Sequence, residues 1–166
     1  LRHRTRSVRR IEVAGEIVYV KAERPTRKGS ESVAEMGHHL ALGAAGFRAP
    51  EPWPALDAKS ADGRPASVLV TREARGPALD RFLAERLPTA SGRDRAAWAR
   101  GIGFAIRALH TARFLHPDLQ AWHLVVDGSP AGGTASLVFL DLARLSRARG
   151  RGGRRGGASG RGALAL

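Results

Sequence analysis

The sequence predicts an α+β fold of two lobes, with a small antiparallel-sheet lobe followed by a helical lobe. Short β-rich runs separated by turns dominate the chain up to about residue 73. The longest stretch of helical periodicity then covers about 93–112. Segregated strands and helices in this order are typical of an α+β fold. We expect the small lobe at about 10–73 and the helical lobe at about 77–145.

The small lobe is expected to begin with a hairpin, because 10–14 and 16–21 are β-rich runs on either side of Gly15. A polar loop follows, and Ser30 or Ser32 can cap a helix over about 31–42. Prolines between 50 and 54 favour an extended chain. A turn at 62–63 and a strand over 66–71 are expected to follow.

The helical lobe is expected to begin with a short helix over 77–87, which has Pro77 at its start. Ser91 is the predicted N-cap of the long helix, because Asp94 lies three residues later in a box-like position. One face of that helix is apolar and is expected to be buried: Trp98, Ile102, Ala105, Ile106 and Leu109. Two strands, over 122–126 and 136–140, complete the lobe.

The net charge of +13 sits at the two ends of the chain. Residues 11–143 carry 16 basic and 15 acidic side chains, so the body is nearly neutral and we do not expect it to bind nucleic acid. We expect a basic N-terminal end at 1–9 and a disordered Arg/Gly-rich tail at 146–166. These ends are either solvated, or they contact anionic lipid or nucleic acid. The chain has no cysteine, which excludes disulfides and thiolate metal sites.

Two acids in the helical lobe have a spacing typical of phosphoryl transfer. Asp118 lies in the loop after the long helix, His123 follows five residues later, and Asp141 ends the apolar run 137–140. In protein-kinase-like folds an Asp accepts the hydroxyl proton, a residue five positions on helps to hold a metal, and a strand-end Asp binds Mg²⁺ on the phosphates of ATP. The sequence therefore predicts a kinase-like phosphotransferase.

We expect Asp118 to be the catalytic base and His116 to orient its loop. Asp141 is the predicted Mg²⁺ ligand. His123 could assist at the metal, or it could donate a hydrogen bond to Asp118 or to a phosphate, because Mg²⁺ prefers oxygen donors. The alternatives are that Asp118 caps a turn, that Asp141 caps a helix and that His123 is a core histidine.

Lys21 ends an alternating apolar strand, as a phosphate-anchoring lysine does, and the helix that follows offers Glu31 and Glu35. Glu35 is the expected partner because it lies deeper in the helix, whereas Glu31 suits the helix dipole of the first turn. The connector between the lobes, with Glu73 and Arg75, occupies the position where kinases bind adenine through backbone groups.

These residues together resemble the lipopolysaccharide kinase (Kdo kinase/WaaP-like) family over about 10–145. The stretch from Glu35 into Gly46-Phe-Arg-Ala-Pro50 looks like the helix and turn of that family, and Asp141-Leu-Ala-Arg144 and the His at position 123 are similar to its motifs. The resemblance implies a bacterial enzyme with a protein-kinase-like fold that uses ATP and Mg²⁺. Its acceptor would be a sugar hydroxyl, on Kdo or heptose, of the lipopolysaccharide inner core. The implied location is cytoplasmic, at the periphery of the inner membrane.

The chain departs from the family in three places. We expect it to be truncated at both ends, because no Gly-rich loop precedes Arg10 and little helical sequence follows Asp141; Gln120 also replaces a common aromatic residue. The alternative function is a non-catalytic kinase-like module that binds a nucleotide or a partner. A third hypothesis, an Arg-rich nucleic-acid-binding protein, is disfavoured by the neutral body and the single tyrosine, Tyr19.

Overall fold

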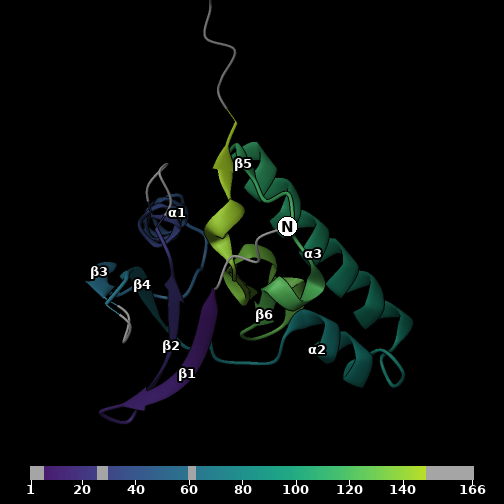
Figure 1. Cartoon of the computed structure of the whole chain (residues 1–166). Helices are drawn as coiled ribbons and strands as arrows, with labels where there is room; N and C mark the ends of the chain where they lie inside the picture. The colour runs from purple at the N-terminus through teal and green to yellow at the C-terminus, as the bar shows by residue number, and fades with distance from the viewer. Residues whose placement is uncertain (1–5, 26–29, 60–62, 149–166) are drawn as a thin grey trace, which may run out of the picture.

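The small lobe of the protein is a four-stranded antiparallel sheet with one helix against it (Figure 1). A computed structural model describes residues 6–25, 30–59 and 63–148. The strands are β1 (Ser7–Val13), β2 (Glu16–Glu23), β3 (Leu56–Lys59) and β4 (Pro65–Arg72), in the order β1-β2-β4-β3. Helix α1 (Glu31–Ala44) connects β2 to β3.

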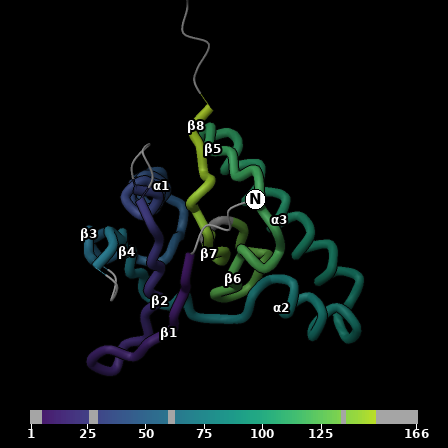
Figure 2. Tube along the Cα trace, viewed as in Figure 1, coloured from purple at the N-terminus to yellow at the C-terminus, as the bar shows by residue number. Residues whose placement is uncertain are grey.

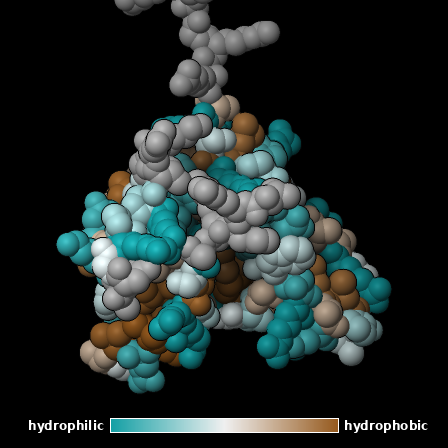
Figure 3. All heavy atoms as spheres, in the orientation of Figure 1, coloured by the Kyte–Doolittle hydropathy of each residue, from teal (hydrophilic) through white to brown (hydrophobic). Residues whose placement is uncertain are grey.

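The β1–β2 hairpin turns through two residues, Ala14 and Gly15, whose φ angles are 51° and 80°. Positive φ at both central residues is the signature of the tight turn whose twist matches that of the flanking strands. The turn fixes the register, which pairs Val13 with Glu16 and Val8 with Lys21. Strand β1 is exposed along its whole length, and apolar residues gather on the hairpin (Figure 3).

The inner strand β4 alternates between buried and more exposed residues, with Ser67, Leu69 and Thr71 facing inward. This period of two is expected of a strand that covers a core on one face. Helix α1 begins at Ser30, whose Oγ accepts a hydrogen bond of 3.2 Å from the Val33 N–H. Of the two N-cap candidates offered by the sequence, Ser30 and Ser32, the structure uses Ser30.

The helical lobe contains α2 (Leu79–Arg86) and the long helix α3 (Gly92–Thr111) (Figure 2). Ser91 Oγ accepts from the Asp94 N–H at 3.1 Å, which confirms the predicted N-cap. Two small antiparallel pairs follow: β5 (Phe114–Leu115) with β8 (Ser146–Arg147), and β6 (Leu124–Val126) with β7 (Leu137–Phe139). The connections form three 3₁₀ turns, η1 (Ala121–His123), η2 (Pro130–Ser136) and η3 (Leu142–Arg144).

One continuous core joins the two lobes. Leu42 from the end of α1 and Phe47 from the loop after it belong to the same buried cluster as Leu109, Phe114 and Phe139 of the helical lobe. The Phe47 ring packs edge-on against Phe114 and Phe139, with centroids 6.2 and 6.0 Å apart. The predicted face of α3 packs against this cluster through Ile102, Ala105, Ile106 and Leu109, while Trp98 packs on Phe82.

Several predicted boundaries were wrong. Strand β1 begins at Ser7 inside the stretch assigned to a basic end, and residues 146–147 form β8 rather than part of the tail. The strand predicted over 122–126 begins only at Leu124, and β3, β5 and β8 were not predicted. Such short strands carry no sequence period of their own and depend on a partner strand. Residues 149–166 of the predicted tail lie outside the described residues.

No helix in the described part of the chain combines the length and apolar character needed to cross a bilayer.

The contact between α3 and η2 gives a stability prediction. A Cβ on Gly101 would overlap the carbonyl oxygen of Pro130, whereas a Cβ on Gly103 of the same helix meets nothing within 4 Å. We expect Gly101→Ala to destabilise the fold by about 2 kcal/mol through overpacking. Gly103→Ala should be neutral or stabilise it by up to about 1 kcal/mol through helix propensity. Urea unfolding of both variants tests the packing, and equal stabilities would contradict it.

Candidate active site

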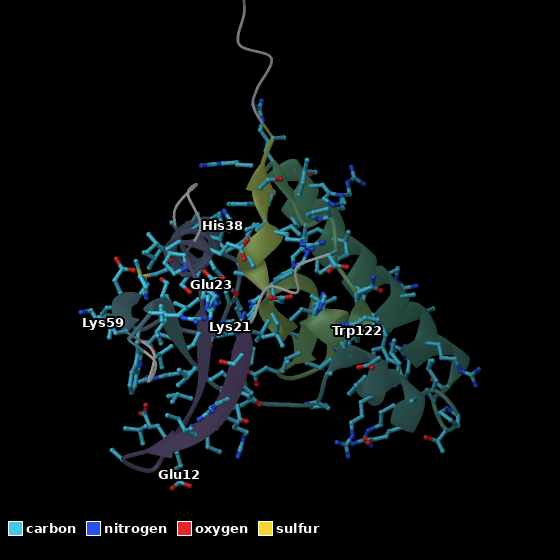
Figure 4. All side chains as sticks on the ribbon, in the orientation of Figure 1. Glu12, Lys21, Glu23, His38, Lys59 and Trp122 are labelled. Atoms are coloured by element: carbon cyan, nitrogen blue, oxygen red, sulfur yellow. The ribbon has the colours of Figure 1, made fainter. Side chains whose placement is uncertain are left out.

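Lys21 of β2 lies between two carboxylates that come from distant parts of the chain, and it points into the centre of the molecule (Figure 4). Its Nζ forms an ion pair with Glu35 Oε1 of α1 and lies 3.4 Å from Asp141 Oδ1, at the end of the β7 segment. The Lys21–Glu35 ion pair predicted from the sequence is therefore present.

Glu35 is the most buried charge of this cluster, with a side chain only 3% exposed. Burial opposes its ionisation, but the nearby His39 imidazole, whose Nε2 lies 3.9 Å from Glu35 Oε1, and the charges of Lys21 and Arg6 together hold its pKa below the usual value. Lys21 and Glu35 are thus an ionised pair whose positions are fixed by the packing of α1 on the sheet. Glu31, the other acid that the sequence offered as a partner of Lys21, lies one turn earlier on α1.

Asp141 has a left-handed backbone, with φ 50° and ψ 57°, directly after β7. It occupies the N-cap position of η3, yet its side chain makes no capping hydrogen bond and instead contacts Lys21 and Arg6. Burial opposes ionisation here too, but those two positive charges keep the pKa of Asp141 below its usual value. The strained backbone thus directs an ionised carboxylate toward the centre of the cluster.

Two stacked histidines hold the loop that carries Asp118. His123 Nδ1 donates to the backbone oxygen of Asp118 at 2.7 Å, and His116 Nε2 donates to the Leu140 oxygen at 3.3 Å. Their rings lie 5.8 Å apart and almost parallel. The bond from His116 ties the loop to the segment that ends at Asp141. Within the described part of the chain, the Asp118 carboxylate makes no hydrogen bond or ion pair.

The hydrogen bonds of His123 fix its tautomer. Because the Asp118 carbonyl can only accept, its short bond places the proton on Nδ1, and Nε2 accepts from the indole N–H of Trp122 at 3.0 Å. The Gln120 N–H lies 3.4 Å from Nδ1, a longer contact that a protonated Nδ1 does not accept. Metal coordination by His123, one of the two roles predicted for it, would therefore require the Trp122 indole to move. Among the described residues, no group of three or more His, Cys, Asp or Glu is arranged to hold a metal.

A cavity of about 860 Å³ lies between the sheet and the helical lobe. Lys21, His123 and Asp141 line it, as do Glu73 and Arg75 of the connector. The Glu73 carboxylate is itself bound by Arg10 Nε at 2.9 Å and by the Tyr19 hydroxyl at 3.3 Å. The structure thus brings together on one cavity all the predicted site residues except Glu35, His116 and Asp118, which lie outside its lining.

Arg6 is the residue of this cluster that sequence reasoning missed. Its Nη2 lies 3.2 Å from Glu35 Oε2 and 3.0 Å from Asp141 Oδ1. Its position in the sequence places it in the predicted basic N-terminal end. No signal in the sequence marks it, because its place beside Lys21 follows from the β1 register that pairs Val8 with Lys21.

The strand lysine contacts both the buried helix glutamate and the late strand-end aspartate, and the lysine and the aspartate line the cavity between the lobes, in the manner of a protein-kinase-like fold. A solved structure, WaaP in complex with acyl carrier protein, shares this fold, with a TM-score of 0.63 and 23% sequence identity. The match covers 86% of this chain and 59% of the WaaP chain.

The chain belongs to the lipopolysaccharide kinase (Kdo/WaaP) family, whose family model matches residues 5–156. The family suspected from the sequence motifs is thereby confirmed. A search of curated proteins found no match.

The lowered pKa of Glu35 gives a pH prediction. Its ionised form stabilises the fold fully above the ordinary value of 4.5, and that contribution is lost as the pH falls through the lower folded-state value. Glu35→Gln should therefore cost about 2 kcal/mol near neutral pH. This deficit should shrink in acid.

Urea unfolding between about pH 7 and about pH 3, which extends well below the ordinary value of 4.5, measures the deficit. Glu12→Gln, at an exposed position of β1, is the matched control and should show no deficit at either pH. A deficit for Glu35→Gln that stays constant over this range would contradict the ionised pair.

Proposed function

We propose that this chain carries the phosphoryl-transfer centre of an ATP-dependent kinase that acts on a sugar hydroxyl, of Kdo or heptose, in the lipopolysaccharide inner core. The observation that carries the proposal is the contact of Lys21 with both Glu35 and Asp141, where Lys21 and Asp141 line the cavity between the lobes. Family membership supports the reaction class. The chain spans 59% of the length of the WaaP chain, so the acceptor rests on the family likeness.

Lys21 is proposed to bind the α- and β-phosphates of ATP. Glu35 holds the ammonium in place, and the lowered pKa of Glu35 keeps that carboxylate charged at neutral pH. The lysine lines the cavity and is 16% exposed, so one side of it is open to a bound phosphate chain. The pair contributes orientation and charge, which are the main contributions of the protein in phosphoryl transfer.

Asp141 is proposed to hold Mg²⁺. Magnesium is usually bound by one or two protein carboxylates together with substrate phosphates, so a single acid on the cavity wall fits its chemistry. The carboxylate is ionised and 39% exposed, as an accessible oxygen ligand must be. When bound, the ion neutralises charge on the phosphates.

Asp118 is proposed as the catalytic base. It would accept the proton of the sugar hydroxyl as that oxygen bonds to the γ-phosphorus and the bond to the β–γ bridging oxygen breaks, which releases ADP. His123 and His116 hold its loop through backbone hydrogen bonds, so their proposed role is positioning. The adenine ring is proposed to bind backbone groups of the connector near Glu73 and Arg75, because the Glu73 side chain is already paired.

A non-catalytic, nucleotide-binding or partner-binding module is the second candidate. One observation favours it: Asp118 is not among the residues that line the cavity. The two candidate functions differ in the role of the Asp118 carboxylate: the kinase requires it as a base, whereas a binding module does not.

We expect Asp118→Asn to lower phosphoryl transfer to a lipopolysaccharide-core acceptor by about 10²-fold or more, because a general base is lost. Nucleotide affinity and thermal stability should stay at parental values, since a loop carboxylate without partners contributes little to packing. The measurement is the transfer of labelled phosphate. Asp57→Asn, which changes an exposed residue of β3, is the matched control. Near-parental turnover in Asp118→Asn would show that Asp118 is not the base.

Asp141→Asn should abolish the part of nucleotide binding that depends on Mg²⁺ and leave metal-free binding nearly unchanged, because the amide is a weak magnesium ligand. Calorimetric titration of ATP with Mg²⁺, and again with a chelator, separates the two contributions. An equal loss under both conditions would mean that Asp141 acts through the fold instead.

A membrane-embedded acceptor favours peripheral contact with the cytoplasmic face of the inner membrane, through the Arg-rich end of the chain. That end lies mostly in 149–166, outside the described residues. Removing 149–166 should weaken binding to anionic vesicles by about 1 kcal/mol per Arg at low salt, and the difference should fade as salt rises. A full chain that ignores anionic vesicles at low salt would refute this contact.

A further inference from the structure

Arg6 contacts both functional carboxylates of the cluster, although no motif assigns it a role. Its Nη2 lies 3.0 Å from Asp141 Oδ1 and 3.2 Å from Glu35 Oε2. The side chain is 30% exposed and lines the same cavity as Lys21 and Asp141. A guanidinium in this position touches the residues to which the phosphates of a bound nucleotide would come closest.

The register of the hairpin explains how Arg6 reaches the site. Val8 of β1 pairs with Lys21 of β2, so their side chains share one face of the sheet. Position 6 is two residues before Val8 and therefore lies on that same face, because side chains alternate along a strand. Arg9 is the neighbour of Val8 on β1, so its side chain lies on the opposite face of the sheet.

The charge balance of the cluster depends on Arg6. Lys21 alone would face Glu35 and Asp141, leaving one net negative charge at the site. With Arg6 the four groups balance. A phosphate chain is strongly anionic, and a net negative charge on these groups would oppose its approach to Lys21, although Arg72 and Arg75 also line the cavity. Arg6 removes this repulsion before any metal is bound.

The arrangement also leaves groups free for binding. Both hydrogen bonds of Arg6 within the described part of the chain use Nη2, so its remaining N–H groups are open to a ligand there. Lys21 and Arg6 both approach Oδ1 of Asp141, and Oδ2 has no partner among the described residues. Donors for a phosphate and an oxygen for Mg²⁺ are therefore available together, without displacing either cation.

We propose that Arg6 is a second phosphate-binding cation of the site, which works beside Lys21 and recognises the β- and γ-phosphates through the fork of its guanidinium. The inference rests on the proposed function, in that it concerns the same nucleotide site. A guanidinium binds phosphate through paired N–H groups that a lysine cannot reproduce.

The test compares Arg6→Gln, Arg6→Lys and Arg9→Gln with the parent in the full chain. Calorimetry measures binding of inorganic triphosphate with Mg²⁺, of a non-hydrolysable ATP analogue with Mg²⁺, and of adenosine. Arg6→Gln should weaken both phosphate-bearing probes by about tenfold or more and leave adenosine binding unchanged. Arg6→Lys should recover part of this loss, and Arg9→Gln, the control on the other face, should match the parent.

The outcomes separate the inference from the proposed function. If the parent binds the analogue and Arg6→Gln binds it equally well, the inference fails and the nucleotide site stands. An equal loss of adenosine binding would show that Arg6 acts only on the fold. If the parent binds inorganic triphosphate in an Arg6-dependent way but ignores the analogue, the phosphate site stands and the ATP assignment fails. A parent that binds neither phosphate probe overturns both.

Discussion

The buried carboxylate of Glu35 is the constraint on which the rest of the site depends. A charge that is 3% exposed is tolerated only with close partners of opposite sign, because its desolvation costs several kcal/mol. Lys21 and Arg6 supply those partners from the β1–β2 hairpin. Helix α1 and the hairpin must therefore meet at one place, and any shift of the helix along the sheet would leave a buried charge unpaired.

The same pairing extends to the helical lobe through Asp141. Lys21 and Arg6 contact its carboxylate, and the shared core around Phe47 and Phe139 holds the segment that ends there. His116 connects the Asp118 loop to that segment through Leu140. The proposed base, the proposed metal ligand and the proposed phosphate-anchoring lysine are thus linked through packing and hydrogen bonds, which is how a rigid scaffold would position groups for phosphoryl transfer.

The elements with strong local signals could be predicted from the sequence. The caps at Ser30 and Ser91 fix helix starts, and the choice of Glu35 as the partner of Lys21 followed from its depth in the helix. Arg6 could not be found, because its role depends on a strand register that no local pattern encodes. His123 was predicted as a site residue, but its particular bonds to the Asp118 backbone and to Trp122 depend on how the loop closes. Strands β3, β5 and β8 are too short to show a period.

The most direct test of the central claim is a double-mutant cycle on Lys21→Met and Glu35→Gln, measured as the affinity for a non-hydrolysable ATP analogue with Mg²⁺. If Glu35 acts by holding Lys21, the double variant should bind about as weakly as Lys21→Met alone, so that the coupling is strongly non-additive. Losses that simply multiply would contradict the claim, because the two residues would then act independently of each other.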